Sequence, residues 1–252
     1  MKRLASLLAL TMAVITMPAF AQSRVPVVQG FASDLQTVPV TGNVPGIGST
    51  YQTYVAILNP TASAFSVQAS LYDTAGVKHD ATINLAAGEL KTFANFLDEV
   101  FQGFKGGGAV TFKSPDSAGG THNNRFIIDA EVRTSGRYGT PVPALEFAGT
   151  SSRSFSPGVT VTASSRTNIG CFNQADSANS IKATVLDSTG KLTLGTVTLN
   201  LVANAWAQTA VTTIVSSGTV QFDPSDSAVC YAVVVDNSTN DGRFIAATEY
   251  KP

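Results

Sequence analysis

The sequence predicts an all-β protein made of two tandem antiparallel β-sandwich domains with an immunoglobulin-like outline. Three observations indicate this fold class. One segment of the 252-residue chain returns later with the same pattern. Both copies alternate apolar and polar residues with the two-residue period of a strand. Turn residues interrupt this alternation every eight to twelve positions. We therefore expect about seven or eight strands in each half.

The repeat relates residues 54–76 to residues 168–190 at a constant offset of 114. The matched positions carry apolar and turn residues: Asn59 with Asn173, Val67 with Ile181, Leu71 with Val185, Asp73 with Asp187 and Gly76 with Gly190. Each half is long enough to bury a core of its own. Because no cluster of reactive residues is repeated, the duplication predicts architecture and not activity.

The N-terminus has the features of a secretory signal peptide. Lys2 and Arg3 precede an apolar run over residues 4–17, and residues 19–21 then give the small-x-small pattern of a cleavage site. The run is too short for a comfortable membrane span. We predict a signal peptide at 1–21, a first domain at 22–150, a second domain at 151–252, and a periplasmic or secreted mature protein.

The charge of the mature chain excludes some classes of partner. It carries 14 Lys and Arg against 17 Asp and Glu, a scattered net charge of −3. This pattern does not favour nucleic acid or an anionic membrane as the partner. With 13% charged residues overall, the composition is typical of an extracellular β-protein and not of a disordered chain.

The strands of the first half are predicted from alternation and from the turns that end it. Residues 51–58 are apolar on both faces, as in an inner strand, whereas residues 65–72 have one clearly apolar face. A turn follows, in which Asp73 can accept hydrogen bonds from the backbone and Gly76 tolerates positive φ. Further strands are expected at 81–85, 108–112 and 126–132.

The second half repeats this order after a short Gly-, Ser- and Thr-rich segment at 149–157. Its strands are expected at 169–172, 181–186, 194–201, 218–222 and 228–235.

One segment in each half departs from the strand pattern. In the first half, apolar residues recur at helical spacing: Phe93, Phe96, Leu97, Val100, Phe101 and Phe104. A shorter counterpart in the second half has Val211, Ile214 and Val215. We expect a short helical segment in each domain, covering one end of its sandwich.

The two cysteines, Cys171 and Cys230, lie in the second half and 59 positions apart. In an oxidising compartment an even pair predicts a disulfide. Since one cysteine lies on an early strand and the other on a late strand, we expect the bond to join the two sheets across the core.

Several of these elements together resemble a tandem β-sandwich repeat of secreted and surface bacterial proteins. The residues that carry the resemblance are Arg166-Thr-Asn-Ile-Gly170, Phe172-Asn173, Val185-Leu-Asp-Ser-Thr-Gly190 and Tyr231-Ala-Val-Val-Val-Asp-Asn-Ser-Thr-Asn-Asp241. The resemblance implies placement outside the cell and a structural or binding role, with no catalytic residues. Gln174 stands where the family pattern has a proline.

The sequence offers no clear catalytic or metal site. Its two histidines, His79 and His122, lie among turn residues, and no Gly-x-Ser-x-Gly nucleophile motif is present. The spacings of His and Cys do not fit zinc. Calcium is a weaker alternative, with loop candidates at Asp223, Asp226, Asp236 and Asp241. We expect these to form turns, and we predict no cofactor and no enzymatic activity.

The remaining candidates are binding residues. Trp206, the only tryptophan, either stacks on a sugar ring or covers the edge of the sandwich, and the second is favoured. The basic, aromatic end of the first half either binds a carboxylate-bearing polymer or partner protein or consists of separate solvated side chains, and the second is favoured; its residues are Arg125, Arg133, Arg137 and Tyr138. We predict an exported, non-catalytic binding or structural protein, such as an adhesion, envelope or matrix-associated module. The alternatives are a glycan-binding or weakly glycan-active protein and a secreted inhibitor.

Overall fold

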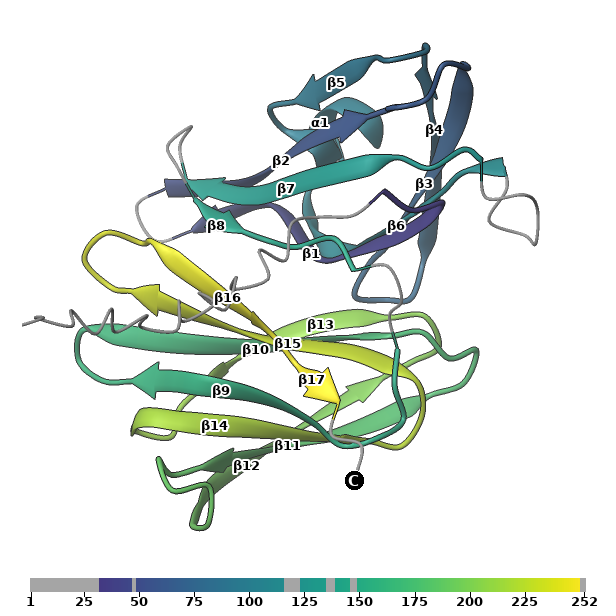
Figure 1. Ribbon diagram of the computed structural model, residues 1–252. Coiled ribbons are helices and arrows are strands. Elements are labelled where there is room, and N and C mark those ends of the chain that lie inside the picture. Colours follow the sequence, from purple (N-terminus) through teal and green to yellow (C-terminus); the bar gives the residue numbers. More distant parts are fainter. Residues whose placement is uncertain (1–31, 47–48, 116–122, 135–138, 146–148, 250–252) are drawn as a thin grey trace, which may run out of the picture.

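The computed structural model describes residues 32–46, 49–115, 123–134, 139–145 and 149–249 (Figure 1). The predicted signal peptide at 1–21 lies outside them. The described chain is all-β, with three antiparallel sheets and one short helix. The strands of the first half are β1 (Leu35–Gly46), β2 (Ser49–Leu58), β3 (Phe65–Tyr72), β4 (Lys78–Leu85), β5 (Leu90–Phe93), β6 (Gly106–Lys113), β7 (Ile127–Thr134) and β8 (Thr140–Pro141).

The second half begins at β9 (Ser154–Val161). Its remaining strands are β10 (Ser165–Asn173), β11 (Asn179–Leu186), β12 (Thr193–Leu201), β13 (Trp206–Val211), β14 (Val215–Pro224), β15 (Ala228–Asp236), β16 (Gly242–Ala246) and β17 (Thr248–Glu249). They form a four-stranded sheet, β13-β10-β15-β16, and a five-stranded sheet, β12-β11-β14-β9-β17.

The duplication extends from sequence to strand pairing. In the first half, β5, β2, β7 and β8 pair in the same order as β13, β10, β15 and β16, and β4-β3-β6-β1 matches β12-β11-β14-β9. The first half nevertheless forms one eight-stranded sheet. The reason is β1, which shifts register against β6 between Val38 and Thr41 and then pairs its last four residues with β2.

The expectation of a helical segment in both halves is correct only for the first. Helix α1 (Phe96–Val100) buries Phe96 and Leu97 against the core of the first half. In the second half, Val211 ends β13, Val215 begins β14 and Ile214 is 79% exposed. Three β-branched residues supply less than a helical face and favour strand. Among the described residues, no helix is long and apolar enough to cross a membrane.

The predicted disulfide is present, but it does not join two sheets. Cys171 on β10 and Cys230 on β15 are direct partners in the four-stranded sheet, with a Cα–Cα distance of 4.1 Å. Both side chains point into the core of the second half and are buried. The expectation of a bond across the core was wrong because early and late strands of this topology are neighbours in one sheet.

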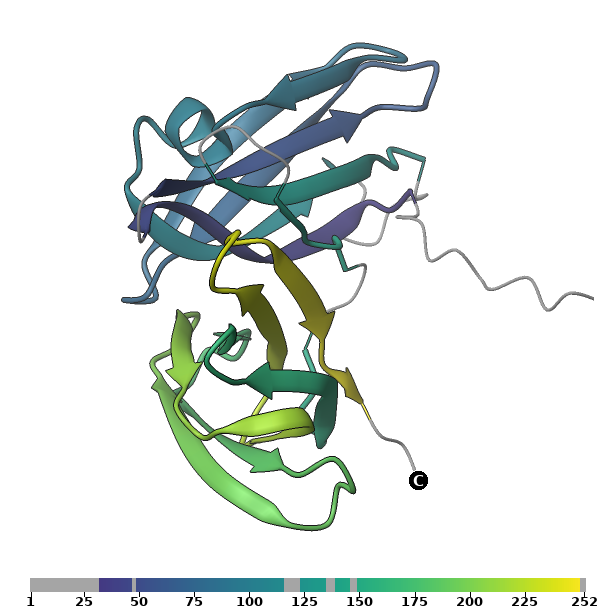
Figure 2. The same cartoon turned by 90° about the vertical axis from the view of Figure 1, so that its left-hand side faces the viewer.

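The two halves pack directly against each other through the outer face of the four-stranded sheet (Figures 1 and 2). Phe172, Trp206, Val229 and Tyr231 of the second half belong to the same buried cluster as the core of the first half. The ring of Phe172 lies 5.0 Å from that of Tyr72, measured between centroids. The backbone N–H of Trp206 donates a 3.0 Å hydrogen bond to the carbonyl of Asp73.

This contact predicts unequal effects of one substitution at two equivalent turns. Gly76 and Gly190 both have positive φ, 76° and 69°. A side chain at Gly76 would place its Cβ 2.4 Å from the carbonyl oxygen of Ala203 in the other half, whereas nothing lies within 4 Å at Gly190. We expect Gly190→Ala to cost about 1 kcal/mol of unfolding free energy, from its backbone conformation alone. Gly76→Ala should cost at least about 1 kcal/mol more.

Denaturant unfolding of the two alanine variants beside the wild type measures this difference. Equal losses of unfolding free energy at the two positions would show that the turn at Gly76 does not contact the second half closely in solution.

Candidate functional site

The site is built on the outer face of strand β10. Residues on a strand point alternately to its two sides. Thr167, Ile169 and Cys171 are fully buried on the inner side. Arg166, Asn168 and Gly170 therefore face the first half, together with the outward residues of β13 and β15.

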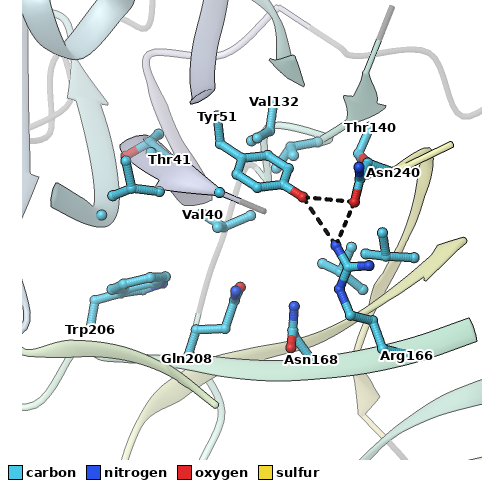
Figure 3. A pocket seen from close by; sticks show the side chains of 17 residues that line it. Val40, Thr41, Tyr51, Val132, Thr140, Arg166, Asn168, Trp206, Gln208 and Asn240 are labelled. Carbon is cyan, nitrogen blue, oxygen red and sulfur yellow. Dashed lines mark hydrogen bonds between the residues drawn. The ribbon is translucent and has the colours of Figure 1, made fainter. Parts of the chain in front are cut away.

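A cavity of about 360 Å³ lies between this face and the first half (Figure 3). Its lining from the first half is Val40, Thr41, Gly42, Val44, Gly46, Tyr51, Gly107, Val132, Thr140 and Val142. Its lining from the second half is Arg166, Asn168, Trp206, Gln208, Val233, Val235 and Asn240. Six valines from both halves line it, and most of the lining surface is apolar although several polar side chains reach it. A concave apolar site with a few convergent polar groups is typical of small-molecule binding.

One end of the cavity carries a fixed cation. Arg166 Nη2 donates hydrogen bonds of 3.0 Å to Tyr51 Oη and 3.0 Å to Asn240 Oδ1 (Figure 3). Its Nη1 donates a 2.9 Å bond to Asn237 Oδ1. Tyr51 Oη also lies 3.4 Å from Asn240 Oδ1. The guanidinium is thus held by β2 of the first half and by the hairpin that joins β15 to β16.

The other end is closed by Trp206, which is 8% exposed. Its Nε1 donates a 3.1 Å bond to Tyr231 Oη, and the Tyr231 hydroxyl donates a 3.0 Å bond to Gln208 Oε1. Burial raises the pKa of Tyr231 far above its usual range, so the hydroxyl stays protonated. Gly170 allows this arrangement, because a Cβ there would lie 2.2 Å from the Tyr231 oxygen.

The lining combines one cation with neutral polar groups and apolar side chains. None of the described residues that line the cavity is His, Cys, Asp or Glu. In the same part of the chain, no three such residues come together as a metal site would need. The lining therefore offers a single cation, neutral hydrogen-bonding groups and apolar walls.

The residues predicted from sequence reach this site only in part. Trp206 lines the cavity, although it is a wall and not an open platform for a sugar. Arg133 lies over the ring of Tyr54 at 3.7 Å from its centroid and donates a 2.8 Å bond to Glu131. Arg137 and Tyr138 lie outside the described residues.

The four calcium candidates lie in separate contacts. Asp223 pairs with Arg153 at 2.6 Å, and Asp226 accepts hydrogen bonds from Ser177 and from its neighbour's backbone. Asp236 accepts bonds from Ser238 and Thr239 and caps the β15–β16 hairpin, and Asp241 lies at the far end of that hairpin. Partial burial works to raise the pKa of Asp223, but the hydrogen bonds from Arg153 and Gln221 and the nearby positive charges together hold the pKa below the usual value.

Sequence reasoning missed Tyr51, Asn168 and Asn240 as site residues, and it treated Arg166 only as part of a family pattern. A usable signal was present. Arg166, Asn168 and Gly170 alternate on a strand whose intervening residues are apolar or small. Arg166 and Asn168 lie on the outward face of this strand, beside a glycine that lets another chain segment approach closely. This combination indicates a contact surface.

No protein-family model matches the chain, and a search of curated proteins finds no match either.

Proposed function

We propose that this is an exported, non-catalytic binding protein whose ligand occupies the cavity between its two halves. The observation that carries the proposal is the cavity itself, about 360 Å³ with apolar walls from both halves and one fixed cation. Its volume lies within the range of small-molecule sites. The disulfide and the N-terminal signal-like segment support a place outside the cytoplasm.

A glycan is the second candidate, because Trp206 contributes to the wall. Sugars are bound through many hydrogen bonds as well as stacking on an aromatic face. Most of the lining surface is apolar, so an apolar ligand fits it better. An adhesive or inhibitory role through the hairpin at 236–241 has less support, since Asn237 and Asn240 of that hairpin are engaged by Arg166.

Trp206 makes the proposal directly testable. As the only tryptophan of the chain it reports on the cavity alone. We expect the neutral apolar dye N-phenyl-1-naphthylamine to bind with one-to-one stoichiometry and to receive excitation energy from Trp206. Gly42→Leu should abolish this binding, because a Cβ at Gly42 meets only Val44, at 3.8 Å, and the added side chain fills the cavity.

Gln68→Leu is the matched control, since Gln68 is an exposed residue of β3 away from the cavity lining. Its binding should equal that of the wild type. Undiminished dye binding by a folded Gly42→Leu variant, or no stoichiometric binding by the wild type, would overturn the proposal.

A further inference from the structure

We infer that the ligand is an apolar acid, a molecule with a compact apolar body and a single anionic head group, and that Arg166 binds the head group. This inference rests on the proposed function and names the ligand class of the same cavity. Two features support it: the apolar walls of the cavity, and the hydrogen-bond partners of Arg166 at its end.

The walls select an apolar body. Six valines and Trp206 surround the space between the two ends: Val40, Val44, Val132, Val142, Val233 and Val235 are the valines. Burying apolar surface against them is favourable. A sugar would set hydroxyls against these valines, and a buried hydroxyl without a partner is unfavourable.

Among the described residues, the cation at the end has no anionic partner. All three hydrogen bonds of Arg166 go to neutral acceptors, on Tyr51, Asn237 and Asn240. No carboxylate of the described residues forms an ion pair with it. The guanidinium is half-buried at the end of an apolar cavity, and a carboxylate offers it both charge and hydrogen-bond acceptors.

The guanidinium keeps donors for such a ligand. Arginine has five N–H groups, and the three bonds occupy Nη1 once and Nη2 twice. The Nε–H and the second Nη1–H donate to no described residue. Because Tyr51 and Asn240 hold Nη2 from opposite halves, the remaining donors have a fixed direction. A fixed guanidinium loses little rotational freedom when it binds a carboxylate.

Three probes with the same chain test the ligand class on the wild-type protein. Decanoate, decanol and decyltrimethylammonium differ in head-group charge, and each is titrated by calorimetry and by Trp206 emission below its micelle concentration. We expect decanoate to bind at least about ten-fold more tightly than decanol, since a charge-assisted hydrogen bond contributes about 1.5–3 kcal/mol. Decyltrimethylammonium should bind most weakly.

Two variants assign the preference to Arg166. Arg166→Gln should bind decanoate and decanol equally, because it removes the charge. Arg153→Gln is the matched control, since it makes the same change at an arginine that pairs with Asp223 and does not line the cavity. It should keep the preference for decanoate. The wild-type comparison stands even where a variant does not fold.

The outcomes separate this inference from the proposed function. Equal wild-type affinity for decanoate and decanol, or an undiminished preference in a folded Arg166→Gln, would overturn the acid as the ligand class while the cavity remained a binding site. Binding of a disaccharide in place of all three probes would also overturn it. If neither the dye nor any probe binds, the proposed function fails as well.

Discussion

Replacing Cys171 and Cys230 together by alanine is expected to lower the unfolding free energy by about 4 kcal/mol. The disulfide closes a 59-residue separation in sequence, and the chain-entropy model gives about this value for a loop of that length. Denaturant unfolding of the double variant and of the oxidised wild type measures the loss. The wild type unfolded and refolded in a reducing agent should show a similar loss.

The first half shows why this bond is structural. Cys171 and Cys230 are register partners on β10 and β15, and the equivalent strands β2 and β7 place Ile57 opposite Ile128. Both isoleucines are buried in the core of the first half. One half thus fills this position by aliphatic packing and the other by a disulfide. If the double variant lost less than about 1 kcal/mol of unfolding free energy, the disulfide would not stabilise the protein by restricting the unfolded chain.

Local patterns predicted part of the strands because the causes of alternation are local, whereas β1, β9, β13 and β16 lie outside the expected ranges. The alternation over 65–72 and the turn at 73–76 correspond to β3 and to a turn in which Asp73 accepts the N–H groups of Ala75 and Val77. The prediction of a helix in the second half was wrong. It depended on only three residues, Val211, Ile214 and Val215, which are β-branched and favour strand. This segment instead forms the end of β13 and the start of β14, where Val211 pairs with Thr167 and Val215 pairs with Val161.

Two features could not be predicted in this way: the placement of both cysteines in one sheet, and the cavity between the halves. Both depend on which segments distant in sequence lie side by side. The cavity needs Tyr51 and Val132 from the first half to meet Arg166 and Asn240 from the second. Nothing in a two-residue period states how one half docks on the other. The sequence indicates Trp206 because it is the only tryptophan. Its role as a wall of the cavity depends on how the first half packs on the second.

The second large effect is expected at the duplicated asparagines. Asn59→Ala and Asn173→Ala should each cost about 3–5 kcal/mol of unfolding free energy, because each leaves several buried backbone groups without partners. Both side chains are fully buried. Thermal and denaturant unfolding of the two variants measure the losses.

The two asparagines make three matching bonds, and similar losses at the two positions are therefore part of the prediction. Asn59 Nδ2 donates to the carbonyls of Ser63 and Ala86, both at 2.8 Å. Asn173 Nδ2 donates to the equivalent carbonyls of Ser177 and Val202, again both at 2.8 Å. Each Oδ1 accepts a backbone N–H two residues later, that of Thr61 at 2.9 Å in one case and that of Ala175 at 3.1 Å in the other.

Asn84→Ala is the control that separates this buried role from a general effect of losing an amide. Asn84 is exposed on β4 and accepts one bond, from Ser66, so its loss should cost less than about 0.5 kcal/mol. If Asn59→Ala and Asn173→Ala cost no more than Asn84→Ala, the buried asparagines do not hold the two halves in their common fold. Large and equal losses would mean that the repeat preserves a polar anchor for the loop after the second strand of each half. Apolar alternation alone does not specify such an anchor, because alternation fixes which face is buried but not where the following loop attaches.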